Sequence, residues 1–435
     1  MDFCELLLER MVAAFGCTEP VALAYGASRA SFLLKDEPRK IHAILSGNII
    51  KNANSVKVPG TEGRKGIEIS LAVGAFLGDY TRKLEVISDI DKSKLEYMDE
   101  LIEKGLVEVE LDHDKIGLYI DIRMENGQKS SEVIIKDFHT NIVYEEVNGR
   151  VILDKRCEEN SDTNTGDLDF DLIYDFSKNG DYSRLTDILD KEISYNYSIA
   201  KEGLENSWGA NIGKLLLKEA KDNPIEKYIA YAAAGSDARM AGCENPVVIN
   251  SGSGNQGITV SVPLIAYYYD NNISRDALYR SLVFSNLIAL YIKEGIGELS
   301  AYCGVVSASA AAMAGLAFMK NQDKEIIKNT IINTLATNSG ILCDGAKESC
   351  AAKIASSLKI AYLSYIQAKT GNTFKKGDGI ATSDVDKMIK RVGNIAKKGM
   401  RETDKVILNE MINKWELLCL WDYIKIYTEI KIRDH

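Results

Sequence analysis

The chain has 435 residues, of which 46% are hydrophobic and 27% charged, and its net charge is −10. This composition is that of a globular protein and excludes a disordered, collagen-like or coiled-coil chain. The acidic balance gives no electrostatic reason to bind a phosphate backbone, so we expect no nucleic-acid partner. The chain has only four histidines, which leaves few candidates for a multi-histidine metal site or a histidine-based triad.

The N-terminal segment lacks the basic and then apolar layout of a signal peptide. It therefore predicts a cytoplasmic protein whose eight cysteines stay reduced. Residues 302–319 form an uncharged stretch of nearly the length of a membrane span, but most of them are Ala, Ser and Gly. This stretch predicts a central helix packed on all sides, and we expect no membrane contact.

The first 155 residues combine helical and strand patterns. Apolar residues recur at helical spacing over 1–35 around an elbow in which Thr18 resembles an N-cap and Pro20 suits a first helical turn. A helical pattern resumes over 67–77, and another fits 93–104. Short alternating runs predict strands at 84–87, 107–111, 118–122, 132–135 and 141–144, followed by a hairpin around Asn148-Gly149.

From about residue 169 the pattern is helical, and Gly-rich loops at 241–257, 293–299, 338–345 and 370–379 interrupt it. Loops held by a helical scaffold commonly carry function. The expected fold class is α+β, a mainly helical catalytic domain with an inserted small α/β module. The expected domains are 1–83 (the N-terminal helical part), 84–155 (the inserted module) and 156–435 (the helical catalytic domain), with a polar linker at 157–168 and an amphipathic helix over the last 25 residues or so.

Three cysteines suggest a shared site. Cys303 opens the small-residue helix, and Cys343 and Cys350 bracket a short polar segment. Two residues seven apart on one helix are separated by about 10.5 Å along its axis. We therefore expect Asp344 to cap a helix beginning near Gly345, with Cys343 in the preceding turn and Cys350 one to two turns inside. Three thiolates suit a zinc site or an iron–sulfur cluster with one open iron, and three unrelated buried cysteines are the alternative.

Five motifs together resemble the L-cysteine desulfidase family, which is related to the α-chain of the iron–sulfur L-serine dehydratases. They occur in order between residue 16 and about residue 353, so the resemblance covers most of the chain. They are Gly16-Cys17-Thr18-Glu19-Pro20, Ser46-Gly47-Asn48-Ile49-Ile50-Lys51-Asn52, Ser251-Gly252-Ser253-Gly254-Asn255-Gln256-Gly257, Gly297-Glu298-Leu299-Ser300-Ala301-Tyr302-Cys303-Gly304 and Cys343-Asp344-Gly345-Ala346-Lys347.

This resemblance implies a non-redox [4Fe-4S] lyase without pyridoxal phosphate, which converts L-cysteine and water to pyruvate, ammonia and hydrogen sulfide. The three cluster ligands of the related dehydratases map by position onto Cys303, Cys343 and Cys350. The dehydratases space the last pair more widely, so Cys17 is the alternative to Cys350 as a ligand.

The chemistry of this elimination suggests roles for the motif residues. An open iron binds a leaving sulfur well, and Cys17 would accept the α-proton if a helix N-terminus lowered its pKa, with Glu19 or Lys51 as alternatives. Glu19 could also hold the substrate ammonium group. The Gly- and Ser-rich loop can offer backbone N–H groups to a carboxylate. The expected substrate-binding residues are Ser46, Asn48, Asn52, Ser251, Ser253, Gly254 and Asn255.

Several functions remain open at this stage. L-serine or L-threonine dehydration by the same type of cluster is the first alternative. A cluster-binding sensor without turnover is the second, although the acidic chain shows no basic recognition helix, and a zinc hydrolase is the third. The expected partner is a small amino acid, and a homodimer is compatible with the sequence.

Overall fold

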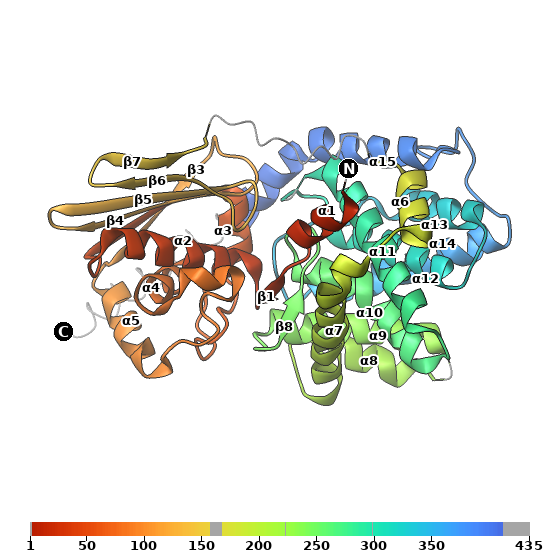
Figure 1. Ribbon diagram of the computed structural model, residues 1–435, viewed down its shortest axis with the longest axis horizontal. Helices are drawn as coiled ribbons and strands as arrows, with labels where there is room; N and C mark the ends of the chain where they lie inside the picture. Colours follow the sequence, from red (N-terminus) through yellow and green to blue (C-terminus); the bar gives the residue numbers. More distant parts are fainter. Residues whose placement is uncertain (1, 157–167, 222, 298, 412–435) are drawn as a thin grey trace, which may run out of the picture.

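The computed structural model describes residues 2–156, 168–221, 223–297 and 299–411. Two bodies lie side by side, one built on a β-sheet and the other, which is larger, built of helices (Figure 1). The predicted α+β class is therefore confirmed. The predicted linker and terminal helix, with Cys157 and Cys419, lie almost entirely outside the described residues.

The sheet has six strands in the order β3-β2-β4-β5-β6-β7. The pair β2–β3 is parallel and all other neighbours are antiparallel. The hairpin predicted at Asn148-Gly149 joins β6 to β7. The strands are β2 (Lys40–Ser46), β3 (Val107–Asp112), β4 (Tyr119–Asn126), β5 (Lys129–Lys136), β6 (Ile142–Val147) and β7 (Arg150–Asp154).

Helices α2 (Thr18–Leu34) and α4 (Ile67–Leu77) cover one face of this sheet, and α5 (Leu95–Glu103) packs beside α4 (Figure 1). The bounds of α4 agree with the predicted helix at 67–77. α2 and α4 approach closely at Gly74, where a Cβ atom would overlap the backbone of Ala24. This close contact buries most of both helices.

Strand β2 is a difference from the sequence interpretation. Residues 40–46 were expected in the N-terminal helical part, but they form a strand between β3 and β4, in the same sheet as residues 107–154. Ile41, Ala43 and Leu45 alternate along β2 and are fully buried, a period-two pattern that the sequence interpretation missed. The sheet therefore includes chain from both sides of the proposed boundary at 83/84.

The helical body surrounds one small-residue helix, α12, as predicted for 302–319. Fourteen of its 16 residues are buried, and it packs against α10, α11, α13 and α14. Ala, Ser and Gly let these neighbours approach closely. The body contains α6 (Phe170–Asn179), α7 (Thr186–Glu205), α8 (Ile212–Glu219), α9 (Pro224–Met240), α10 (Gly254–Asp270), α11 (Arg275–Ile296), α12 (Gly304–Met319), α13 (Lys324–Asn338), α14 (Cys350–Lys369) and α15 (Val385–Asn394).

The N-terminus belongs to the helical body, although it precedes the sheet in the chain. α1 (Phe3–Arg10) lies against that body, and β1 (Ala13–Phe15) pairs with β8 (Pro246–Val248) in a two-stranded sheet (Figure 1). The elbow between β1 and α2 therefore crosses from one body to the other. It carries Cys17 at the junction of the two bodies.

The strand predicted at 84–87 is wrong, because Tyr80–Glu85 form a 3-10 helix and the following residues form turns. Leu84 lies in the 3-10 helix and Val86 in the turn that follows it, and both side chains are buried. Their spacing of two residues therefore resembles the alternation of a strand. Over the part of the chain that the structure covers, no helix combines the length and the apolar character that crossing a membrane requires.

Candidate active site

The backbone brings Cys303 and Cys343 together. The segments before α12 and α14 pair in an antiparallel bridge, in which Cys303 N–H donates to Ile341 O at 3.0 Å and Cys343 N–H donates to Ala301 O at 2.7 Å. The two thiols interact, and this interaction, opposed by burial and assisted by the Lys51 charge, lowers the pKa of Cys343. The same interaction together with burial raises the pKa of Cys303.

Cys350 lies near this pair but is held by its own loop. It is the first residue of α14, and its Sγ accepts from Lys347 N–H at 3.5 Å and donates to Gly345 O at 3.7 Å. The expected helix start at Gly345 is therefore wrong, because Asp344 forms an ion pair with Lys353 and caps no helix. Burial raises the pKa of Cys350, and its charge interacts with those of Cys303 and Cys343.

The arrangement of the three thiols bears on the type of group they could hold. Among the described residues, no three His, Cys, Asp or Glu side chains are close enough to bind one metal ion. A cluster takes one thiolate on each of several irons, so its ligands lie farther apart than the ligands of one zinc ion. The three thiols interact through their charges but do not form the ligand group of one metal ion, an arrangement compatible with ligands of separate irons.

Four helix N-termini converge on this region. Cys17 is the N-cap residue of α2, Ser253 of α10 and Cys303 of α12, and Cys350 begins α14. The positive ends of helix dipoles stabilise nearby thiolates and carboxylates. The region is therefore suited to a group or substrate with negative charge.

Lys51 adds a fixed positive charge. It lies on α3 (Gly47–Ala53), its side chain is 1% exposed, and its ammonium group donates to Asp404 Oδ1 at 2.6 Å and to Cys343 O at 3.3 Å. An ammonium ion held by a carboxylate is a poor proton acceptor. Its position suits electrostatic support of Cys343 better than the role of base.

The polar residues around Lys51 have different positions. Ser46 donates to Gly117 O at 2.7 Å and holds the end of β2, and Asn52 Nδ2 donates to Asn48 O at 2.8 Å within α3. Of the three residues that we expected to bind substrate here, only Asn48 lines the cleft described below.

Cys17 and Glu19 form a buried pair. Glu19 Oε2 accepts from Cys17 Sγ at 3.3 Å and from Thr18 Oγ1 at 3.0 Å, and Glu19 Oε1 lies 3.8 Å from His139 Nε2. Burial alone would raise the pKa of Glu19, but His139 and the bond from Cys17 lower it to about 2. Burial and the Glu19 charge raise the pKa of Cys17, although a helix N-terminus was expected to lower it. The proton of this pair therefore resides on sulfur.

The loop at 250–255 is fixed from beneath by a buried network. Ser251 Oγ donates to Asn250 Oδ1 at 2.8 Å, Asn250 Nδ2 donates to Asn286 Oδ1 at 2.8 Å, and Asn286 Nδ2 donates to both carboxyl oxygens of Glu192. Ser253 Oγ accepts from the backbone N–H of Gln256 and so caps α10. The two serines thus support the loop, while Gly254 and Asn255 form the first turn of α10.

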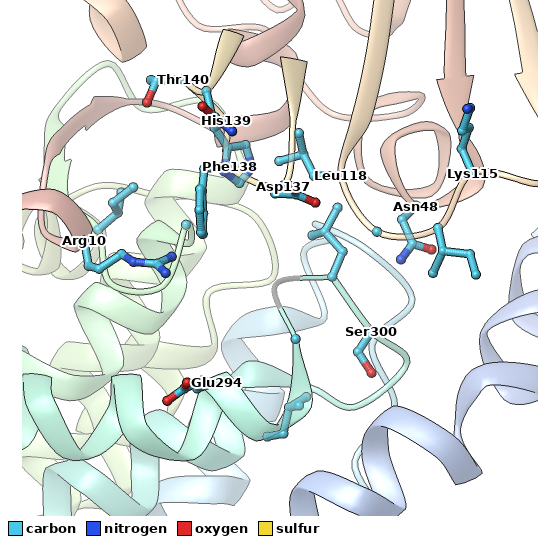
Figure 2. Close-up of a pocket in the computed structure, with 18 of the residues that line it drawn as sticks. Arg10, Asn48, Lys115, Leu118, Asp137, Phe138, His139, Thr140, Glu294 and Ser300 are labelled. Carbon is cyan, nitrogen blue, oxygen red and sulfur yellow. The ribbon is translucent and has the colours of Figure 1, made fainter. Parts of the chain in front are cut away.

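A cleft of about 1900 Å³ lies between the two bodies beside these residues. Asp137, Leu118 and Asn48 line its sheet side, and Ser300 and Glu294 line its helical side (Figure 2). Its wall also includes His139 and Asp404, which contact Glu19 and Lys51 respectively. Ser300 and Ala301, which precede Cys303 in the chain, are among its lining residues, so the cleft reaches the neighbourhood of the buried thiols.

The sequence interpretation missed four residues of this site: Lys347, Asp404, His139 and Arg239. Lys347 stood within a quoted motif; its ammonium group donates to Ser55 Oγ at 2.7 Å, and burial lowers its pKa. Asp404 and His139 are remote in sequence from every motif and carry no local signal. Arg239 lies just before the Gly-rich segment 241–257, but an isolated arginine in a helical pattern does not indicate a site.

Known proteins resemble this chain over most of its length. The family described as "Serine dehydratase alpha chain" matches residues 81–409. A "UPF0597 protein" of Finegoldia magna is 42% identical over 416 residues, which cover 95% of this chain and 100% of that protein. A UPF0597 protein of Desulfitobacterium hafniense is 42% identical over 95% of this chain and 96% of its own length. A UPF0597 protein of Lachnoclostridium phytofermentans is 44% identical over 94% of this chain and 99% of its own length.

Proposed function

This chain belongs to the serine dehydratase alpha chain family, and from that premise we propose that it is an L-cysteine desulfidase, a non-redox [4Fe-4S] lyase. The family indicates a serine dehydratase-like lyase of a type that is associated with iron–sulfur clusters, and both the [4Fe-4S] cluster and the substrate are proposed. The reaction consumes L-cysteine and water and yields pyruvate, ammonia and hydrogen sulfide. The observation that carries the proposal is the meeting of Cys303, Cys343 and Cys350 where helix N-termini converge.

Cys303, Cys343 and Cys350 are the proposed cluster ligands. All three are buried or half-buried free thiols, and the Lys51 ammonium beside Cys343 favours the thiolate form that ligation requires. Cys17 is bonded to Glu19 instead, which favours Cys350 as the third ligand. The bound cluster would supply an open iron that accepts a soft leaving sulfur.

The remaining residues bind substrate and move protons. Glu19 is the proposed partner of the substrate ammonium, because it is buried and stays ionised down to a pH of about 2. Cys17 is the proposed acceptor of the α-proton, a role that requires its thiol, which donates to Glu19, to lose its own proton first. We assign the binding of the substrate carboxylate to the first turn of α10 at Gly254 and Asn255.

L-serine or L-threonine dehydration is the second candidate function, and the family match favours it. The test uses anaerobically reconstituted protein and measures pyruvate and sulfide from L-cysteine and pyruvate from L-serine; 2-oxobutanoate reports L-threonine. The desulfidase proposal expects equal amounts of pyruvate and sulfide and a change in the visible iron–sulfur spectrum on adding L-cysteine. Product from L-serine or L-threonine alone would overturn the substrate assignment. A cluster spectrum without turnover of any amino acid would favour a sensor.

A further inference from the structure

Three buried polar atoms without partners belong to the end of α9 and the first turn of α10, beside the candidate active site. They are Arg239 Nε, Asn255 Oδ1 and Gln256 Oε1, and their residues are 4%, 5% and 4% exposed. An unpaired buried donor or acceptor is costly, so native proteins rarely leave one without a partner. Three at one place indicate that a polar molecule supplies the missing partners.

The charge of Arg239 is also uncompensated. Its guanidinium donates through one terminal nitrogen to Gly16 O at 3.0 Å, and among the described residues no carboxylate forms a hydrogen bond or ion pair with it. The Cys17 thiol lies near it but keeps its proton and is therefore neutral. A buried guanidinium without an anion is unfavourable, and a carboxylate would match its fork of donors.

Glycines make room for these side chains and connect them to the thiols. A Cβ atom on Gly254 would overlap Arg239 Nε, so the guanidinium lies directly against the first residue of α10. A Cβ atom on Gly304 would lie 2.5 Å from Gln256 Cδ, so that amide contacts the residue after Cys303. The unpaired atoms therefore lie between the elbow carrying Cys17 and the start of α12.

We propose that Arg239, with the N-terminus of α10, binds the α-carboxylate of an α-amino acid, and that the amide oxygens of Asn255 and Gln256 join Glu19 in accepting from its ammonium group. This inference rests on the proposed function, because the proposed reaction acts on an α-amino acid. The binding site itself would accept any α-amino acid. The helix of 17 residues adds its positive end to the guanidinium charge. Arg239 is thus the residue that makes the site specific for a carboxylate.

The test measures thermal stabilisation of the cluster-free chain, which separates binding from turnover. The probes are L-cysteine and L-serine, and their counterparts without a carboxylate, cysteamine and ethanolamine. The wild-type chain should be stabilised by the amino acids and not by the amines. Arg239→Gln should weaken amino-acid binding about 30-fold or more. Arg239→Lys should weaken it less, because lysine keeps the positive charge but lacks the paired N–H donors of a guanidinium group.

Arg391→Gln is the matched control, because Arg391 also donates to backbone carbonyls, those of Ile380 and Ala381, but lies on α15 outside the site. This variant should bind amino acids as the wild type does. If Arg239→Gln fails to fold, the comparison of Arg239→Lys with the wild type decides the question.

Three outcomes would overturn the inference. They are a wild-type chain that no amino acid stabilises, equal stabilisation by the amines, and undiminished amino-acid binding by the folded Arg239 variants. A loss of iron and acid-labile sulfide after reconstitution, with amino-acid binding intact, would assign the guanidinium to the cluster instead. Amino-acid binding that depends on Arg239, without sulfide production from L-cysteine, would reject the desulfidase function and leave the inference standing.

Discussion

Glu192→Gln should remove a large pH dependence from the stability of this protein. Glu192 is fully buried on α7 and accepts from Asn286 Nδ2 through both carboxyl oxygens, at 3.0 and 3.2 Å. Burial raises the pKa of Glu192 to about 8, against the effect of the Asn286 bond. At neutral pH the carboxyl group therefore keeps its proton in the folded chain and loses it in the unfolded chain.

The sign and size of the effect follow from this difference. Below pH 4.5 both states hold the proton, and above about pH 8 neither does, so stability falls as pH rises between these values. The fall is about 1.4 kcal/mol per pH unit, or about 3 kcal/mol from pH 5.5 to 7.5. For a chain of 435 residues the unfolding entropy is about 0.9 kcal/mol/K, so the expected decrease in Tm is about 3 °C.

The assay compares the Tm of the wild-type and Glu192→Gln chains, both without cluster, at several pH values. Subtracting the two curves cancels the titration of all other groups. The wild type should lose about 3 °C relative to the variant between pH 5.5 and 7.5. Glu205→Gln, which changes an exposed carboxylate on the same helix, should follow the wild type. A difference between wild type and Glu192→Gln that is independent of pH would refute the reasoning.

Five further variants test the candidate site. Cys303→Ser and Cys343→Ser should each abolish the binding of iron and acid-labile sulfide while the helical circular-dichroism spectrum is kept, and full iron content in either would contradict the ligand assignment. Asp404→Asn should lower the free energy of unfolding, measured in urea, by about 3 kcal/mol, because it leaves the Lys51 ammonium buried without a carboxylate. Lys51→Met should lower it by less than half as much, because the Asp404 side chain that it leaves behind is 17% exposed. The reverse order of the two effects would contradict this account. Gly304→Ala displaces only the end of a glutamine side chain, so it should leave Tm within about 2 °C but weaken amino-acid binding several-fold, and unchanged binding would count against the site.

Much of the fold could be predicted from local patterns. The period of apolar residues gave the helix at 67–77, the small-residue helix near 302–319 and the strands from 107 to 147, because each of these elements buries one continuous pattern. Local patterns predicted the wrong structure at Leu84 and Val86, which are buried although they do not belong to a strand. They also missed strand β2, in which buried residues alternate with more exposed ones. In both places the neighbours that decide the structure are remote in the chain.

The motifs located the candidate thiols, but the partners of those thiols were beyond local reasoning. The pKa of Cys17 shows why: a helix N-terminus lowers the pKa of a thiol, yet full burial beside Glu19 outweighs that effect. Helix α14 shows the same limit, since Asp344 has the side chain of a capping residue but forms an ion pair with Lys353. The outcome of such competitions depends on which groups the fold brings near.

The sequence by itself determined the class of fold, the glycine-rich loops and the cysteines that could share a site, because these depend on residue type and on spacing along one element. Only the tertiary structure decided that β2 joins the sheet, that Asp404 holds Lys51, and that Arg239 lies unpaired against Gly254. These contacts join residues from 15 to more than 350 positions apart, and the burial of the Lys51 and Arg239 charges arises only when separate elements pack around them.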